Sequence, residues 1–265
     1  MNIELLIIGN EILIGKIQDT NSTWMAKRIT KFGHKIKRIT TIGDELEEIS
    51  SALQNILNRE PDIIITSGGL GPTFDDMTLE GVALALNREL ELNQHAYSSV
   101  KKAYDHAFKQ GFLQLEGMTK EREKMAYLPK GSIPLPNIRG TAPGVKIKEG
   151  KTEIYCLPGV PAEMKKIFGI AILPFLKEKK GKFIERGFIL SGIGESQMAP
   201  YVSKLEEQYK QQLWIKSHPR VGLAVEVEIS ITAFNVEDGE ELVESALQEL
   251  KEIVLKLNGK ILEER

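Results

Sequence analysis

The segment from Thr66 to Thr78 combines residue types that together can bind a phosphate, and its sequence is TSGGLGPTFDDMT. It follows the apolar run 63–65, which predicts a buried strand, and it precedes an amphipathic stretch over residues 78–87, which predicts a helix. Glycines in such a turn let the backbone approach a phosphate closely, and the start of a helix offers free N–H groups. Because the adjacent carboxylates of Asp75 and Asp76 would repel a bare phosphate, a divalent cation is their natural partner. The segment therefore predicts a metal-assisted phosphate or diphosphate site.

Each polar or glycine residue of this segment has an expected role. Backbone N–H groups of the glycines would bind phosphate oxygens, hydroxyl groups would add donors, and the two aspartates would hold the cation and take part in catalysis. These residues are Gly68, Gly69 and Gly71 for the backbone, Thr66, Ser67, Thr73 and Thr78 for the hydroxyls, and Asp75 and Asp76 for the metal.

The alternative is a tight turn in which Asp75 or Asp76 only caps the following helix. The segment lacks the lysine and the serine or threonine that end a P-loop, and it lacks the spacing of the dinucleotide fingerprint. It is therefore not one of the common phosphate loops, and both interpretations stay open at this point.

The elements that must position this segment alternate between strand and helix. Apolar runs at 3–8, 36–42 and 63–65 predict strands, and helical apolar periodicity between them predicts helices. Such alternation predicts a parallel sheet with helices on both faces, and ligands bind such sheets at the carboxyl ends of the strands. The polar clusters Asn10/Glu11 and Asp44/Glu45 follow the first two strands, so we expect them near the glycine segment.

Two of these acidic residues are further candidates for chemistry. Glu11 could bind the phosphate group, and either Glu11 or Asp44 could serve as a metal ligand or as a general base. For Asp44 the alternative is a helix cap, since Glu47 lies three residues later, as in a capping box. The four histidines form no ligand cluster, which argues against zinc.

The remainder of the chain predicts a second, smaller unit. Residues 1–180 are expected to form the phosphate-binding α/β domain, and residues 181–265 a small α+β domain of helices on an antiparallel sheet. In the latter we predict a helix from 193 to about 211, a strand over 221–233 with strict alternation, and a helix over 243–259.

Composition narrows the classes of function. Hydrophobic residues make up 42% and charged residues 27% of the chain, and the net charge is −2 without a basic stripe, which argues against a nucleic-acid partner. The single cysteine, Cys156, lies in an apolar run and is expected to be buried. The chain shows no signal-peptide layout and no apolar run of membrane-spanning length, so we expect a cytoplasmic protein without a membrane partner.

The chain resembles the N-terminal domain family of the competence/damage-inducible protein CinA, which is related to the molybdopterin-binding fold of MogA, MoaB and the central domain of MoeA. The motifs that carry the resemblance are the segments 9–15, 19–22, 43–45, 68–78, 140–144 and 157–164, with 192–196 matching the smaller domain. The resemblance covers nearly the whole chain.

This resemblance implies a three-layer molybdopterin-binding-like domain, a homodimer, and a pyrophosphatase that uses a divalent metal (Mg²⁺, Mn²⁺ or Co²⁺) and acts on ADP-ribose or a similar nucleotide. It also implies a lysine that faces the nucleotide, Lys124, and pocket residues at Thr141, Gly144 and Glu163. Many bacterial relatives carry a further domain with nicotinamide-mononucleotide deamidase activity. We do not expect that activity here, because the chain ends at Arg265 without such a domain.

Two other functions fit the same motifs. One is a protein that binds a pterin phosphate such as molybdopterin, or that transfers an adenylyl group to it. The other is a non-catalytic module that binds a nucleotide and signals through the smaller domain. The acidic pair favours the first of these over the second, but it does not separate adenylyl transfer from hydrolysis, because both use a metal.

Overall fold

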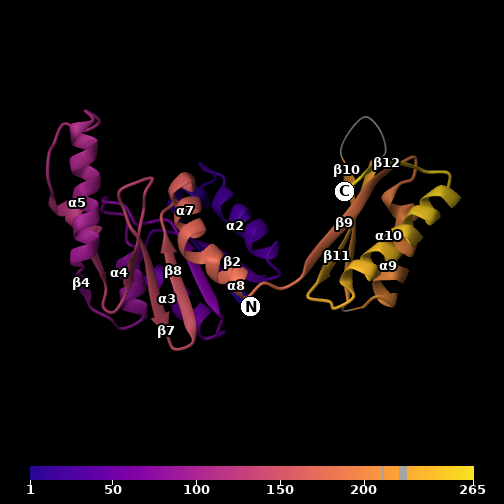
Figure 1. The fold of residues 1–265 in the computed structure, drawn as a ribbon, viewed down its shortest axis with the longest axis horizontal. Helices are drawn as coiled ribbons and strands as arrows, with labels where there is room; N and C mark the ends of the chain where they lie inside the picture. Colours follow the sequence, from indigo (N-terminus) through magenta and orange to yellow (C-terminus); the bar gives the residue numbers. More distant parts are fainter. Residues whose placement is uncertain (211, 221–225) are drawn as a thin grey trace. The chain divides into compact units, whose positions relative to one another are not determined.

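The computed structural model describes residues 1–210, 212–220 and 226–265, and these residues form two compact units (Figure 1). One unit comprises Met1–Thr30 and His34–Lys179, and the other comprises Lys31–Gly33 and Lys180–Arg265. No helix among the described residues is long and apolar enough to cross a membrane.

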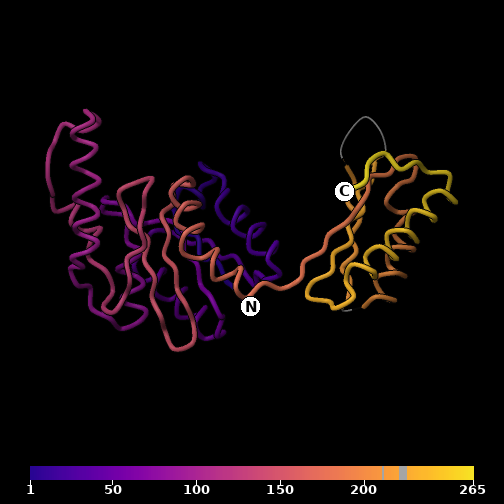
Figure 2. Tube along the Cα trace, viewed as in Figure 1, coloured from indigo at the N-terminus to yellow at the C-terminus, as the bar shows by residue number. Residues whose placement is uncertain are grey.

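Strands and helices alternate along the N-terminal unit. The path of its chain can be followed in Figure 2. Its strands are β1 (Asn2–Ile8), β2 (Lys35–Ile42), β3 (Ile63–Ser67), β4 (Leu90–Leu92), β5 (Tyr127–Pro129), β6 (Ile133–Leu135), β7 (Gly144–Glu149) and β8 (Thr152–Leu157). Its helices are α1 (Asn10–Leu13), α2 (Thr20–Thr30), α3 (Leu46–Leu57), α4 (Thr78–Ala85), α5 (Gln94–Lys109), α6 (Lys120–Lys124), α7 (Pro161–Ile167), the π-helical turn η1 (Phe168–Ile172) and α8 (Leu173–Glu178).

The central sheet of this unit has six strands in the order β2-β1-β3-β8-β7-β6. The first four run parallel, whereas β7 and β6 are antiparallel to their neighbours. The predicted parallel sheet is thus confirmed, with a hairpin added at one edge. Because β1, β2, β3 and β8 are parallel, their carboxyl ends meet at one edge of the sheet, where the polar loops follow.

Apolar side chains on both faces of the sheet hold this edge in place. Alternate residues of a strand point to opposite faces, so Leu6 and Ile64 pack with α3, α4 and α5, while their neighbours in sequence face the other layer. Helices α2, α7 and α8 lie together on that other face (Figure 1). Burial of each such leucine or isoleucine contributes roughly 1.5–3 kcal/mol to stability. The predicted burial of Cys156 is confirmed, and burial raises the pKa of its thiol to about 12.

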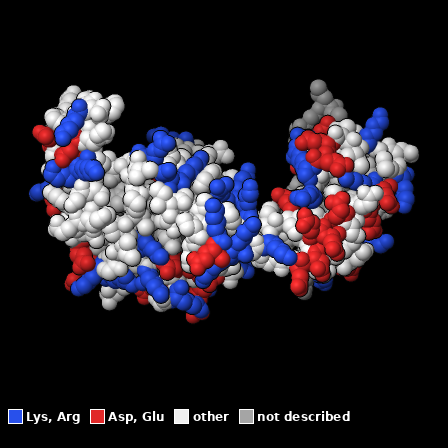
Figure 3. All heavy atoms as spheres, in the orientation of Figure 1, with Lys and Arg blue, Asp and Glu red and all other residues white. Residues whose placement is uncertain are grey.

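The C-terminal unit is an antiparallel sheet with strand order β10-β11-β9-β12, packed with two helices. Its elements are β9 (Phe183–Ser191), α9 (Glu195–Gln208), β10 (Leu213–Arg220), β11 (Glu226–Phe234), α10 (Gly239–Lys256) and β12 (Lys260–Glu264). The predicted α+β class is therefore confirmed. On the face drawn in Figure 3, acidic side chains gather over this unit.

One strand and one boundary in this unit differ from the prediction. The described part of the predicted strand over 221–233 is confirmed as β11, and a separate strand that we did not predict, β10, precedes it. The sequence did not indicate β10, because its alternation is short and includes Pro219, a residue that usually marks an edge strand. Helix α9 ends at Gln208; position 211, where we predicted its end, and positions 221–225 lie outside the described residues.

Candidate functional site

The loops that follow β1, β2, β3 and β8 surround one cavity of about 590 Å³, which we call the acidic pocket. Six carboxylates line it, and none of the described residues that line it is a lysine, arginine or histidine. The six acidic residues are Glu11, Asp19, Asp44, Asp75, Asp76 and Glu163. The convergence expected from the parallel sheet is therefore observed, and the excess of negative charge favours a cation in this pocket.

The glycine turn after β3 has a backbone that only glycine adopts easily. Gly68 has φ 119° and Gly69 has φ 63°, both in the region that disfavours residues with a Cβ. A Cβ on Gly68 would collide with the carbonyl oxygen of Ile8, and one on Gly69 would collide with the hydroxyl of Thr78. The loop is thus pressed against β1 and the start of α4, which fixes its position in the pocket.

Free N–H groups are the consequence of this turn. The loop is tied down through its carbonyls: the Thr78 hydroxyl donates to the Gly68 carbonyl (2.8 Å) and the Thr78 N–H to the Gly69 carbonyl (3.1 Å). Within the described residues, no acceptor takes the N–H groups of Gly69, Leu70 and Gly71, all of which line the pocket. Successive free N–H groups in a glycine turn form a concave site for an anion.

The acidic pair follows at once and shares a single hydroxyl group. The Thr73 hydroxyl lies in hydrogen-bond contact with Asp75 Oδ1 and, at 2.5 Å, with Asp76 Oδ2; Asp76 Oδ2 also accepts from the Thr73 N–H (2.9 Å). One hydroxyl has one proton, so it can donate to only one of the two carboxylates at a time. The hydrogen bond from Thr73 lowers the pKa of Asp75 below its ordinary value. Asp75 therefore stays charged at neutral pH, and neither aspartate makes a side-chain cap on α4.

Asp44 enters the pocket from the loop after β2. Its Oδ2 accepts the N–H of Asn10 (2.7 Å), and burial, followed by the charges of Glu11, Asp75 and Asp76, raises its pKa above the ordinary value. The predicted capping box is wrong: α3 has Glu45 at its N-cap without a side-chain bond. The Asp44 carboxylate is instead used to hold the loop after β1.

The three predicted metal ligands do not form a ready-made cage. Among the residues that the structure describes, no group of three or more His, Cys, Asp or Glu side chains could hold a metal ion. The set Asp75, Asp76 and Glu11 is therefore not preassembled, although all three line the pocket. Mg²⁺ usually binds through one or two carboxylates together with substrate phosphates and water. The Asp75–Asp76 pair fits that kind of site, with the remaining ligands supplied by the substrate.

Lys124 has a role that differs from the expectation. Its Nζ donates to the Thr73 carbonyl (2.9 Å) and lies 3.5 Å from Glu80 Oε1, and it is not among the residues that line the pocket. The lysine therefore braces the acidic loop from outside. The prediction that it faces the nucleotide does not match this geometry.

Four other predicted residues are absent from the lining of the pocket. Thr66 and Thr78 are fully buried, and Gly144 is buried in β7 against Ile167. These residues lie in a buried strand or at a buried helix start. Asn10 contributes its backbone N–H to Asp44, as described above, and its side chain is likewise not part of the lining.

The predicted residues Ser67, Thr141 and Glu163 do line the pocket. The Ser67 hydroxyl is already engaged, since it accepts from Asn21 (3.0 Å) and donates to the Pro158 carbonyl (3.3 Å). Glu163 Oε2 accepts from Asn137 Nδ2 (2.6 Å). We did not single out Asn21, whose Nδ2 also reaches the Gly159 carbonyl (2.7 Å) and ties the loops after β3 and β8 to α2. The sequence feature that could have indicated Asn21 is its position in the segment 19–22, one of the motifs that carry the family resemblance.

The comparison with known families agrees with this architecture. A family model described as a probable molybdopterin binding domain matches residues 4–178, which span the sheet and the acidic pocket. A protein of Sulfurisphaera tokodaii is 44% identical over 265 residues, covering 98% of this chain and 97% of the relative. A protein of Sulfolobus acidocaldarius is 40% identical with the same coverage.

A solved structure supports the same relationship. The protein CinA of Thermoplasma acidophilum, a protein of unknown function, is 36% identical and superposes with a TM-score of 0.58. The match covers 64% of this chain and 96% of that chain. The resemblance to the CinA N-terminal domain family is thereby confirmed.

Proposed function

The chain belongs to the family of probable molybdopterin-binding domains, and we propose that it binds a phosphorylated nucleotide in the acidic pocket and hydrolyses its diphosphate bond with a divalent cation. The observation that carries this proposal is the juxtaposition of anion donors and cation ligands. The free N–H groups of residues 69–71 and the carboxylates of Asp75 and Asp76 line the same pocket. A metal-bound diphosphate uses both kinds of group at once.

Each group of residues in the acidic pocket has a separate role in this proposal. The N–H groups of Gly69, Leu70 and Gly71 bind oxygens of one phosphate. Asp75 and Asp76 would hold the cation, which would supply charge neutralisation and a more acidic water. Asp44, whose pKa is raised by burial, is the residue that we assign to take the proton from the attacking water. With ADP-ribose, addition of water across the diphosphate bond gives AMP and ribose 5-phosphate.

The test is an incubation of the purified protein with ADP-ribose, with and without Mg²⁺, Mn²⁺ or Co²⁺, followed by separation of the products. We expect AMP and ribose 5-phosphate only with a metal, and only when Asp75 and Asp76 are intact. Folded protein that gives no product with any of the metals would contradict hydrolysis of this substrate.

A second candidate is favoured by the family description. A protein that binds a pterin phosphate, or transfers an adenylyl group to it, would use the same glycine turn and the same acidic pair. It differs in its products, because adenylyl transfer from ATP releases pyrophosphate only when an acceptor is present. The same preparation incubated with ATP, metal and a pterin phosphate therefore separates the two candidates.

A further inference from the structure

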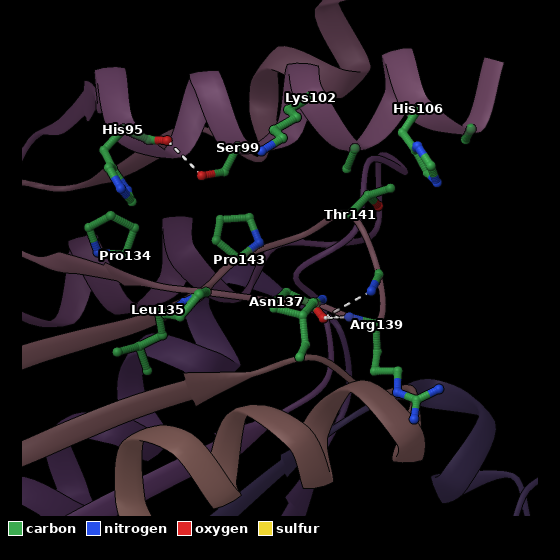
Figure 4. A pocket seen from close by; sticks show the side chains of 15 residues that line it. His95, Ser99, Lys102, His106, Pro134, Leu135, Asn137, Arg139, Thr141 and Pro143 are labelled. Atoms are coloured by element: carbon green, nitrogen blue, oxygen red, sulfur yellow. Dashed lines mark hydrogen bonds between the residues drawn. The ribbon is translucent and has the colours of Figure 1, made fainter. Parts of the chain in front are cut away.

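A second cavity, of about 570 Å³, lies between helix α5 and the loop 134–143 (Figure 4). The helix contributes His95, Ser99, Lys102 and His106, which are spaced by four, three and four residues and so share one face. In Figure 4 the rings of His95 and His106 point from the helix toward the loop. The Ser99 hydroxyl donates to the His95 carbonyl (2.9 Å), and the side chain of Arg139 points away from the helix. The loop contributes an apolar surface that includes Pro134, Leu135 and Pro143.

This cavity has the opposite charge to the acidic pocket, and we call it the basic pocket. Lys102, Arg139, His95 and His106 line it, and none of the described lining residues is an aspartate or glutamate. Neither Lys102 nor Arg139 forms an ion pair among the described residues. The neighbouring Lys101, which does not line the basic pocket, is paired with Asp105 at 2.6 Å. The Lys102 ammonium group is thus available to an anion in the basic pocket.

The basic pocket adjoins the acidic one. Thr141 lines both pockets, and the loop that carries it is held rigidly between them. Asn137 donates to the Ala142 carbonyl (2.8 Å) and to Glu163 Oε2 (2.6 Å), and its Oδ1 accepts from the N–H groups of Arg139 (3.1 Å) and Gly140 (3.0 Å). Thr141 is thus the residue at which the two pockets meet.

We propose that the basic pocket takes a phosphomonoester group of the same nucleotide whose diphosphate lies in the acidic pocket. The proposal rests on the function proposed above and narrows it to nucleotides that carry a separate phosphate beside the diphosphate. Lys102 provides the charge, Thr141 provides a hydroxyl donor, and the proline-rich surface packs against the sugar. Arginine and lysine are the side chains best suited to a phosphate, and here no carboxylate competes for them.

The matched ligands for the test are ADP-ribose and 2′-phospho-ADP-ribose, which differ by one phosphomonoester. Their dissociation constants are measured by calorimetry with Ca²⁺ in place of the catalytic metal, on the full chain. We expect the phosphorylated ligand to bind about tenfold more tightly, as one charge-assisted contact gives. Lys102→Met should abolish this preference and Lys102→Glu should reverse it, while Lys101→Met, on the adjacent residue outside the pocket, should keep it.

Equal affinities of the wild type for the two ligands, or a preference that survives Lys102→Met, would overturn the proposal. Thermal melting of each variant shows whether it is folded, and these exposed positions should leave it unchanged. Hydrolysis is assayed separately. A preference for the phosphorylated ligand without hydrolysis would refute the proposed function and support the phosphate site in the basic pocket. Hydrolysis without this preference would support the proposed function and refute the phosphate site.

Discussion

The acidic and basic pockets adjoin each other and have nearly equal volumes, about 590 and 570 Å³, yet they are built in different ways. The acidic pocket is made of loops at the ends of parallel strands, with backbone conformations that need glycine. The basic pocket is made of one helix face against a loop, with exposed side chains that need no special backbone. The first can bind through its backbone and a cation, whereas the second can bind only through side chains. Changes in the first should therefore have larger effects.

The largest effect should come from the acidic pair. In the double variant Asp75→Asn/Asp76→Asn the cation loses both of its protein ligands, so metal-dependent turnover of ADP-ribose should fall by at least about 100-fold. Asp105→Asn, on α5 and outside the acidic pocket, is the matched control and should keep turnover within about twofold. A double variant that retains most of its metal-dependent activity would remove the basis for placing the cation here.

The glycine turn should be the most sensitive part of the acidic pocket in terms of stability. Gly68→Ala introduces a Cβ that collides with the Ile8 carbonyl, in addition to an unfavourable φ, and should lower the free energy of unfolding by roughly 3 kcal/mol. Gly15→Ala has the milder φ of 71°, and nothing lies within 4 Å of its Cβ, so about 1 kcal/mol is expected. Denaturant titration measures both. Equal losses would show that neither the contact with β1 nor the φ of Gly68 has the expected energetic effect.

Burial of Asp44 should make the stability of the protein depend on pH. Its pKa is raised above 3.8 in the folded protein, mainly by burial, so folding disfavours its ionised form. The stability that it contributes is therefore present below pH 3.8 and is lost as the pH rises through its folded pKa. Asp44→Asn keeps an acceptor for the Asn10 N–H and removes this loss. The free energy of unfolding of the variant minus that of wild type, measured by chemical denaturation, should therefore be larger at pH 7 than at pH 3.5. A difference that does not change with pH would contradict the account.

The smallest of these effects should come from Lys124. Because it donates to the Thr73 carbonyl from outside the acidic pocket, Lys124→Met should remove one loop contact worth about 1 kcal/mol and reduce turnover about fivefold. Arg88→Met, which removes a cation from the surface of the same unit outside both pockets, should leave turnover unchanged. A loss of turnover for Lys124→Met as large as that of the double aspartate variant would instead support direct contact between Lys124 and the nucleotide, as the family resemblance implies.

The two pockets also differ in how far the sequence could predict them. The strand–helix alternation placed Glu11, Asp44 and the glycine turn at one edge of a parallel sheet, and the structure confirms that convergence. It could not reveal that Thr66 and Thr78 face the core, since the pattern is ambiguous at the junction of strand and turn. It also could not separate a capping box at Asp44 from a hydrogen bond to Asn10, which depends on the distance between two loops.

The basic pocket was missed for a different reason. Residues 95, 99, 102 and 106 have helical spacing, but a polar helix face with that spacing is ordinarily solvated. Only the position of the loop 134–143 opposite this face makes it a cavity, and that position depends on contacts far apart in the sequence. Side-chain sites between a helix and a distant loop are thus less visible in a sequence than backbone sites that glycines mark.

The central claim is that the acidic pocket binds a diphosphate and a divalent cation jointly. It is tested most directly by measuring Mn²⁺ binding by electron paramagnetic resonance, with and without the non-hydrolysable α,β-methylene-ADP. Since only two carboxylates form the protein part of the site, we predict weak binding of Mn²⁺ alone, at least about tenfold tighter binding with the nucleotide, and an equal gain of nucleotide affinity with Mn²⁺. Mn²⁺ affinity that is the same with and without the nucleotide would contradict the account.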